Sequence, residues 1–138
     1  MSYEKSDWKV GSTNDDFPMI IRSRSTLPDQ AYKDKYQHLI IVKWKYTCSD
    51  RGMPDKASRE AMDFFEQKLE AALTSKNNGV LAATKTGQSI KEWRYYNLDT
   101  QEFMSSLNEI SDPNSPFPID LQLFDDPNWE ALAEIIGQ

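Results

Sequence analysis

Apolar and polar residues alternate most clearly between His38 and Cys48, and this alternation predicts a β-strand. One row of side chains should face a core, and it comprises His38, Ile40, Val42, Trp44, Tyr46 and Cys48. The opposite row comprises Leu39, Ile41, Lys43, Lys45 and Thr47. This second row is therefore apolar at its start and basic at its end.

Two longer helices are predicted from apolar residues at helical spacing. The first runs from about Asp55 to Ser75, with Asp55 as its N-cap and Lys76-Asn77-Asn78-Gly79 as its closing turn. Its apolar stripe comprises Ala57, Ala61, Phe64, Phe65, Lys68, Leu69, Ala72 and Leu73. The second helix covers Thr100–Ile110, and its inward side chains should be Phe103, Met104, Leu107 and Ile110.

Shorter strands are predicted in the remaining apolar stretches. Trp8–Val10 and Phe17–Ser25 should form a first hairpin, because turn-forming residues separate them. Val80–Lys85 and Ile90–Asn97 should form a second hairpin around Gly87, and Pro118–Phe124 is a last strand. These segments supply the remaining strands of one sheet.

The order of elements from His38 onward is strand, helix, strand, strand, helix, strand. This order predicts an α+β fold with a ferredoxin-like split β-α-β-β-α-β core. The N-terminal hairpin is added to that core, Leu27–Gln37 is a loop or short helix, and a terminal helix runs from Asp126 to Ile136 with Pro127 at its first position. Two helices can cover only one face of such a sheet, so the other face must meet the hairpin, a second subunit or solvent.

The composition indicates a single domain over residues 1–138, because domains most often contain about 100–150 residues. Hydrophobic residues are only 38% of the chain, but the 12% aromatic share allows a compact core. No apolar run approaches the roughly 18 residues of a membrane span, and the N-terminus does not resemble a secretory signal. With one cysteine, Cys48, no intramolecular disulfide can form, and we expect a cytoplasmic protein without membrane contact.

Charge is distributed unevenly along the chain. The net charge is −6, with a net of +2 over residues 1–60 and −8 over residues 61–138. From Asn97 to Gln138 there are nine acidic residues and no Lys or Arg. This balance argues against nucleic-acid binding, which depends on Lys and Arg at phosphates. The acidic end is either a solvated face or a surface for a basic partner, which could be another protein or the basic Arg22–Arg59 region of this chain.

No catalytic or metal-binding motif is present in the sequence. There is no nucleophile elbow, phosphate loop or dinucleotide fingerprint, and the ligand spacing of a zinc site is missing. His38 and Cys48 would lie about 33 Å apart on one strand at ~3.3 Å per residue, so they cannot form a nucleophile pair. The adjacent acids Asp15-Asp16 and Asp125-Asp126 fall in predicted loops and should be solvated. We therefore expect no catalytic residue, metal or cofactor.

Basic and aromatic residues on the predicted sheet form a second candidate site. Lys43, Lys45, Arg94 and Tyr96 could hold a small anion on an open sheet face. Trp93 and Tyr95 beside Arg94 could also stack nucleic-acid bases, but the acidic total charge opposes that function. A face fully packed by apolar side chains would exclude the anion site.

Five short motifs occur in order along the chain: Trp8, then Gly52-Met53-Pro54 after Cys48, Phe65-Glu66-x-x-Leu69, Thr84-x-x-Gly87 followed by Trp93-x-Tyr95-Tyr96, and Asp126-Pro127-Asn128-Trp129. Together they resemble the bacterial domain-of-unknown-function family 695, over nearly the whole chain. Members of that family are small α+β proteins, sometimes joined to a domain similar to the protein regulator of ribonuclease E. The resemblance implies regulation by binding and assigns no catalytic residue.

The sequence thus favours a non-catalytic protein-binding or regulatory module, with Asp125, Asp126 and Trp129 as candidate contact residues. An inhibitor or immunity-type protein for a basic nuclease or toxin is a concrete form of this hypothesis. A small-anion binder or enzyme that uses the open sheet face is the second hypothesis. A homodimer formed through that face is the third.

Overall fold

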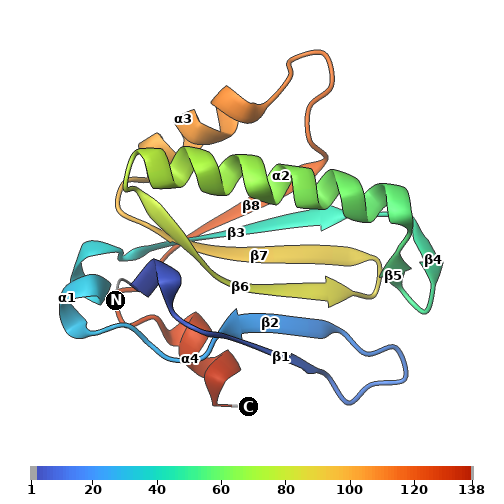
Figure 1. Cartoon of the computed structure of the whole chain (residues 1–138), viewed down its shortest axis with the longest axis horizontal. Helices are drawn as coiled ribbons and strands as arrows, with labels where there is room; N and C mark the ends of the chain where they lie inside the picture. The colour runs from blue at the N-terminus through green and yellow to red at the C-terminus, as the bar shows by residue number, and fades with distance from the viewer. Residues whose placement is uncertain (1–2, 138) are drawn as a thin grey trace.

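A computed structural model describes residues 3–137, except for the side chains of residues 48–50. It has an antiparallel sheet of six strands in the order β1-β2-β6-β7-β3-β8 (Figure 1). The strands of this sheet are β1 (Trp8–Ser12), β2 (Ile20–Arg24), β3 (His38–Lys45), β6 (Gly79–Gly87), β7 (Ile90–Asn97) and β8 (Ile119–Asp125). The other elements are the 3-10 helix η1 (Tyr3–Lys5), the small hairpin β4 (Cys48–Asp50) and β5 (Met53–Pro54), and helices α1 (Gln30–Lys35), α2 (Lys56–Ser75), α3 (Thr100–Ile110) and α4 (Glu130–Ile136). The predicted α+β class is confirmed.

Helices α2 and α3 cover one face of the sheet, where the larger hydrophobic core lies (Figure 1). Strand β3 contributes Ile40, Val42 and Trp44 to this core, as its alternation predicts. Helix α2 contributes Met62, Phe65, Leu69 and Leu73, and helix α3 contributes Phe103 and Leu107. The predicted helical stripes were wrong at two large side chains, because Phe64 is 53% exposed and Met104 is 36% exposed.

The opposite face of the sheet is covered by α1, η1 and α4, which was not expected from the sequence. Its core comprises Tyr36, Leu39, Ile41, Val80, Ala82, Ala83, Tyr96, Trp129, Leu132 and Ile135. The N-terminal hairpin does not lie on this face. Instead β2 pairs with β6 in the plane of the sheet, from Ile20↔Thr86 to Ser23↔Ala83. The second face, which was expected to meet the hairpin, a second subunit or solvent, is therefore covered by helices of the same chain.

Two predicted boundaries need correction. The strand from His38 ends at Lys45, and Cys48 begins the separate strand β4, so the distance argument from a single strand does not hold. Helix α4 begins at Glu130 rather than at Pro127, because Trp129 at its N-cap has a left-handed φ of 56°. Other boundaries are confirmed: Asp55 caps α2 by accepting from Ser58 N–H at 2.8 Å, and α3 has the predicted range.

The closing turn of α2 also follows the prediction. Asn77 adopts a φ of 50°, and the N–H of Asn78 donates to the carbonyl of Leu73 at 3.1 Å. This geometry is that of a Schellman motif, which satisfies the last carbonyls of a helix. Within residues 3–137, no helix has both the length and the apolar character that a membrane crossing requires.

Candidate functional site

Tyr96 and Trp129 form a buried aromatic stack that joins α4 to the sheet. Their ring centroids are 3.7 Å apart and the rings are nearly parallel, at 6°. The Trp129 Nε1–H donates to the carbonyl of Tyr36 at 2.8 Å, and both side chains are fully buried. The predicted contact residue Trp129 therefore holds the helix in place and does not reach the surface.

Asp126 completes this attachment. Its carboxylate accepts the Tyr96 hydroxyl at 2.7 Å and the N–H groups of Glu130 and Ala131 at 2.9 and 3.0 Å. Burial and the hydrogen bond to Asp126 raise the pKa of Tyr96. Three hydrogen bonds occupy the Asp126 carboxylate, so it acts as the cap of α4.

The predicted anion-binding residues are not gathered in an open site. Tyr96 is buried in the stack, and Arg94 donates from Nε to Glu92 at 2.9 Å and from Nη1 to the carbonyl of Ala131 at 3.0 Å. Lys43 belongs to a row of residues that are paired across four neighbouring strands. In the order β6, β7, β3 and β8, these residues are Lys85, Glu92, Lys43 and Asp120. Because positive and negative residues alternate in this row, the charge of Lys43 is compensated on both sides. Lys45 is exposed at the end of the strand.

Asp125 differs from its neighbour Asp126. Its side chain is 82% exposed, and it contacts His38 Nδ1 at 2.8 Å at the surface. The predicted pair of solvated acids thus consists of one exposed residue and one buried cap.

A groove of about 320 Å³, the β8–α4 groove, lies between β8 and α4. Its lining residues are Leu39, Ile41, Arg94, Phe124, Asp125, Asp126, Glu130, Ala131 and Glu134. Glu130 and Glu134 are one turn apart on α4, and neither has an ion-pair partner among the described residues. Like charges at this spacing repel each other on a helix. The groove therefore combines apolar side chains with the carboxylates of Glu130 and Glu134, of which Glu134 interacts electrostatically with Lys85.

Strand β8 borders this groove and forms one edge of the sheet. Among the described strands only β3 pairs with it. In this strand Leu123 is 54% exposed and Phe124 is 47% exposed. Exposed apolar residues on an open edge are unusual, because proteins commonly protect such edges with charge or a bulge.

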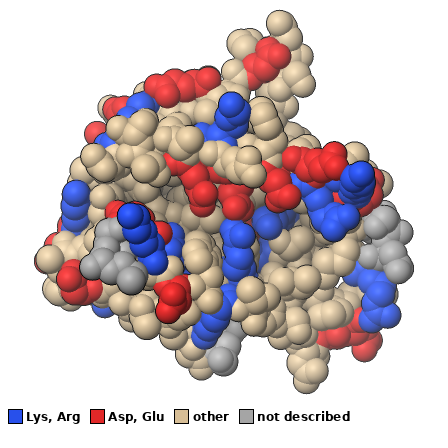
Figure 2. Space-filling view, in the orientation of Figure 1, with Lys and Arg blue, Asp and Glu red and all other residues tan. Residues whose placement is uncertain are grey.

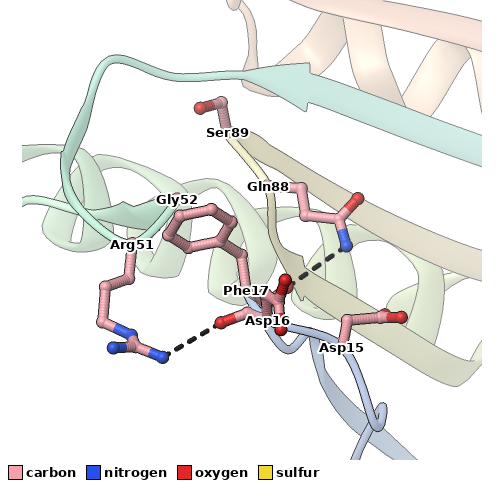
Figure 3. A pocket seen from close by; sticks show the side chains of 7 residues that line it. All are labelled: Asp15, Asp16, Phe17, Arg51, Gly52, Gln88 and Ser89. Carbon is pink, nitrogen blue, oxygen red and sulfur yellow. Dashed lines mark hydrogen bonds between the residues drawn. The ribbon is translucent and has the colours of Figure 1, made fainter.

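A separate hollow of about 650 Å³ lies between the tips of three loops (Figure 3). Arg51 Nη2 donates to the carbonyl of Asp16 at 3.0 Å, and Gln88 Nε2 donates to the carbonyl of Phe17 at 3.2 Å. In Figure 3 the Phe17 ring lies between the side chains of Arg51 and Gln88, and its centroid is 5.9 Å from the Arg51 guanidinium. The polar side chains of this hollow thus tie the loops together.

A charged cluster lies between α2 and β2, and the sequence reasoning missed it. In Figure 2 acidic side chains follow the lower edge of α2, with Lys and Arg side chains directly below. Arg22 Nη2 contacts Glu66 at 3.0 Å, and Trp93 Nε1–H donates to the same carboxylate at 2.8 Å. The ring of Trp8 lies near both Arg22 and Arg24, at 4.8 and 4.3 Å. Two sequence features could have predicted this cluster. Arg22 and Arg24 alternate along one strand, and two glutamates of α2 are four residues apart.

Burial shifts the pKa values of charged groups in this cluster. It raises the pKa of Glu70, with a further contribution from Glu66, and it lowers the pKa of Lys91. The Tyr95 hydroxyl is buried and has no hydrogen-bond partner among the described residues. Desolvation of this kind destabilises the charged form of a group.

We expect E70Q to stabilise the protein at neutral pH. Because the folded pKa of Glu70 is raised, its contribution to stability is full below the unfolded pKa and is lost as pH rises through the folded pKa. The gain in unfolding free energy should grow from pH 4 to pH 7 and reach about 1 kcal/mol or less, since the side chain is partly solvated. Urea unfolding at both pH values measures it, with E60Q at an exposed position of α2 as control. A variant less stable than wild type at pH 7 would contradict this account.

Possible metal ligands were compared over the described residues. The described residues contain no group of three or more His, Cys, Asp or Glu side chains placed to hold an ion.

The comparison with protein families identifies the chain. A model described as a family of unknown function, DUF695, matches residues 6–135. The chain belongs to the DUF695 family. A comparison with curated proteins finds no match, and neither does one with solved structures.

Several of the segments that resemble this family have structural roles in this chain. The Asp126-Pro127-Asn128-Trp129 segment supplies the cap and the stack that attach α4. Phe65 and Leu69 lie in the core, and Glu66 anchors Trp93. These segments thus stabilise the fold, and the β8–α4 groove lies next to Asp126.

Gly52 of the segment Gly52-Met53-Pro54 allows a close approach of two turns. Its φ is 79°, and its carbonyl accepts the Ser89 N–H at 2.9 Å and the Tyr46 hydroxyl at 2.6 Å. A Cβ at this position would lie 2.7 Å from the backbone N of Gln88. Only glycine fits there without displacing the turn of the β6–β7 hairpin.

Proposed function

We propose that this protein is a non-catalytic protein-binding module whose partner presents a basic segment to the β8–α4 groove. The observation that carries the proposal is the set of exposed carboxylates around an apolar floor. Glu130 and Glu134 line this groove together with Phe124 and Leu39. Asp125 also lines it, but its carboxylate contacts His38 on the α2 face. An apolar centre with a polar rim is typical of protein interfaces.

Charge supports a basic partner. Arg94 is the one basic residue that lines the described groove, and its guanidinium is engaged by Glu92 and by the carbonyl of Ala131. The chain from Asn97 onward contributes no Lys or Arg of its own. Complementary charge would raise the association rate and exclude acidic competitors.

The proposal assigns no catalytic residue. Asp126 and Tyr96 are engaged with each other, and His38 contacts Asp125 at the surface. An inhibitor or immunity-type protein for a basic nuclease or toxin is one form of the proposal, and a regulatory subunit is another. Its location in the cytoplasm remains a prediction.

We also propose that β3-α2-β6-β7-α3-β8 is a ferredoxin-like split β-α-β-β-α-β core. The support is the order β6-β7-β3-β8 within the larger sheet, with α2 and α3 packed on one face. In that arrangement the last strand lies at an edge, which is the position of β8. The fold would therefore present β8 to a partner.

Titration with a short synthetic peptide of alternating lysine and valine tests the proposed function. By calorimetry, we expect affinity to fall at least about tenfold between about 50 mM and 500 mM salt, because exposed charges are screened. The double variant E130Q/E134Q should bind about fivefold more weakly or worse. The control D15N/D16N removes the same formal charge at a distant loop, and its affinity should stay within about twofold. Equal loss in both variants, or equal binding of a glutamate–valine peptide, would contradict a localised acidic site.

A further inference from the structure

The outer edge of β8 has free hydrogen-bonding groups. The N–H of Asp126 donates to the carbonyl of Gln37, at the start of β3, at 2.8 Å. Backbone groups alternate in direction along an antiparallel strand, so those of Phe124 and Gln122 also point toward β3. The N–H and C=O groups of Leu121, Leu123 and Asp125 therefore point away from the sheet. In residues 3–137, no backbone or side-chain hydrogen bond to these outward groups is found.

We infer that the basic partner segment binds as an additional β-strand on this edge of β8. The inference rests on the proposed function and specifies its geometry. Strand addition would satisfy the outward groups of Leu121, Leu123 and Asp125, and main-chain hydrogen bonds would supply part of the affinity. The strand has seven residues, which is enough for several such bonds.

The exposed side chains of β8 define what such a strand would meet. Leu123 is opposite Ile40 and lies on the α2 face, whereas Phe124 is opposite Leu39 and lies on the α4 face. A strand placed about 4.8 Å beyond β8 would direct every second side chain to the α4 face. A lysine or arginine there can extend across Phe124 toward Glu130 and Glu134, while the intervening apolar residues pack beside Leu123. The recognised sequence therefore alternates basic and apolar residues.

A second copy of this chain fits the edge less well. Self-pairing of β8 would bring together strands that each carry Asp120 and Asp125 and contain no basic residue. Like charges on paired strands are destabilising. The other described edge of the sheet, β1, carries Lys9, but Lys9 Nζ already donates to the carbonyl of Ile136 at 3.1 Å. Charge complementarity thus favours a foreign basic segment.

The variant L123P tests strand addition directly. Proline removes the outward N–H of Leu123 but none of the hydrogen bonds to β3, and proline is tolerated on edge strands. We expect the affinity for the lysine–valine peptide to fall at least about tenfold in L123P. The comparison variant L123T keeps the N–H but also loses the Leu123 side chain, so L123P should still bind at least about fivefold more weakly than L123T. Circular dichroism establishes that both variants are folded, and if L123P does not fold, hydrogen exchange on the wild-type protein replaces it.

Hydrogen exchange of the wild-type complex gives the second measurement. The amides of Leu121, Leu123 and Asp125 should exchange at least about tenfold more slowly in the presence of peptide. Peptide binding that is unchanged in L123P, or that leaves these amides unprotected, would overturn strand addition while leaving the proposed function in place. Absence of peptide binding in wild type would overturn both. A dimer by light scattering that L123P dissociates would show a second copy as the occupant and would overturn the foreign segment.

Discussion

Replacing Trp129 with alanine should lower the free energy of unfolding by about 3–5 kcal/mol, the range for large aromatic residues in cores. The side chain is fully buried, stacks on Tyr96 at 3.7 Å, and has the edges of the Tyr3 and Tyr32 rings against it at 5.6 and 5.9 Å. Its loss would also leave the carbonyl of Tyr36 without the indole donor. Because Trp129 is the N-cap of α4 and attaches it to the sheet, we expect this helix to detach first.

Urea unfolding followed by far-UV circular dichroism measures the effect of W129A. The variant W129F keeps a ring for the stack but lacks the N–H, so it should be intermediate in stability. Phe64, which is exposed on α2, provides the control, and F64A should cost less than about 1 kcal/mol. A loss in W129A no greater than that in F64A would show that α4 is not held by this side chain.

The second large effect is expected at Gly52. G52A should reduce the unfolding free energy by about 2–3 kcal/mol, because alanine at a φ of 79° is strained and its Cβ meets backbone atoms of Gln88 at 2.7 and 2.8 Å. Backbone atoms cannot move aside as a flexible side chain can. The turn of the β6–β7 hairpin must therefore shift, and the hydrogen bond from Ser89 N–H to Gly52 would weaken.

Gly11 provides a matched control for this substitution. No atom lies within 4 Å of a Cβ built at Gly11, and its φ is not in the left-handed region. G11A should therefore stay within about 0.5 kcal/mol of wild type in the same denaturation experiment. Equal stability of G52A and G11A would mean that the two turns are not in close contact.

Local patterns predicted the elements whose signals lie within a short stretch of chain. The alternation from Ile40 to Trp44 identified the core side of β3, and Asp55 marked the start of α2. The second layer could not be predicted in the same way. Helix α4 has seven residues and two fully buried apolar side chains, Leu132 and Ile135, so its periodicity is too short to indicate which face it covers.

The candidate site depends on arrangement in space more than on local sequence. Asp125 and Asp126 are adjacent and chemically identical, yet one is exposed and the other caps α4. Side chains alternate between the two faces of a sheet, so Asp125 lies beside His38, whereas Asp126 lies on the α4 face and accepts the N–H groups of Glu130 and Ala131. The sequence shows an acidic end without Lys or Arg. Only the fold shows that Glu130, Glu134 and Phe124 line one groove.

The position of the peptide on the protein tests the central claim most directly. In a titration of isotopically labelled protein with the lysine–valine peptide at low salt, followed by NMR, we expect the largest amide shifts at Leu123, Phe124, Glu130 and Glu134. The amides of the loop hollow around Phe17 and of the charged cluster around Glu66 and Glu70 on α2 should remain unchanged. Shifts centred on either of those regions, or none anywhere, would contradict binding at the β8–α4 groove.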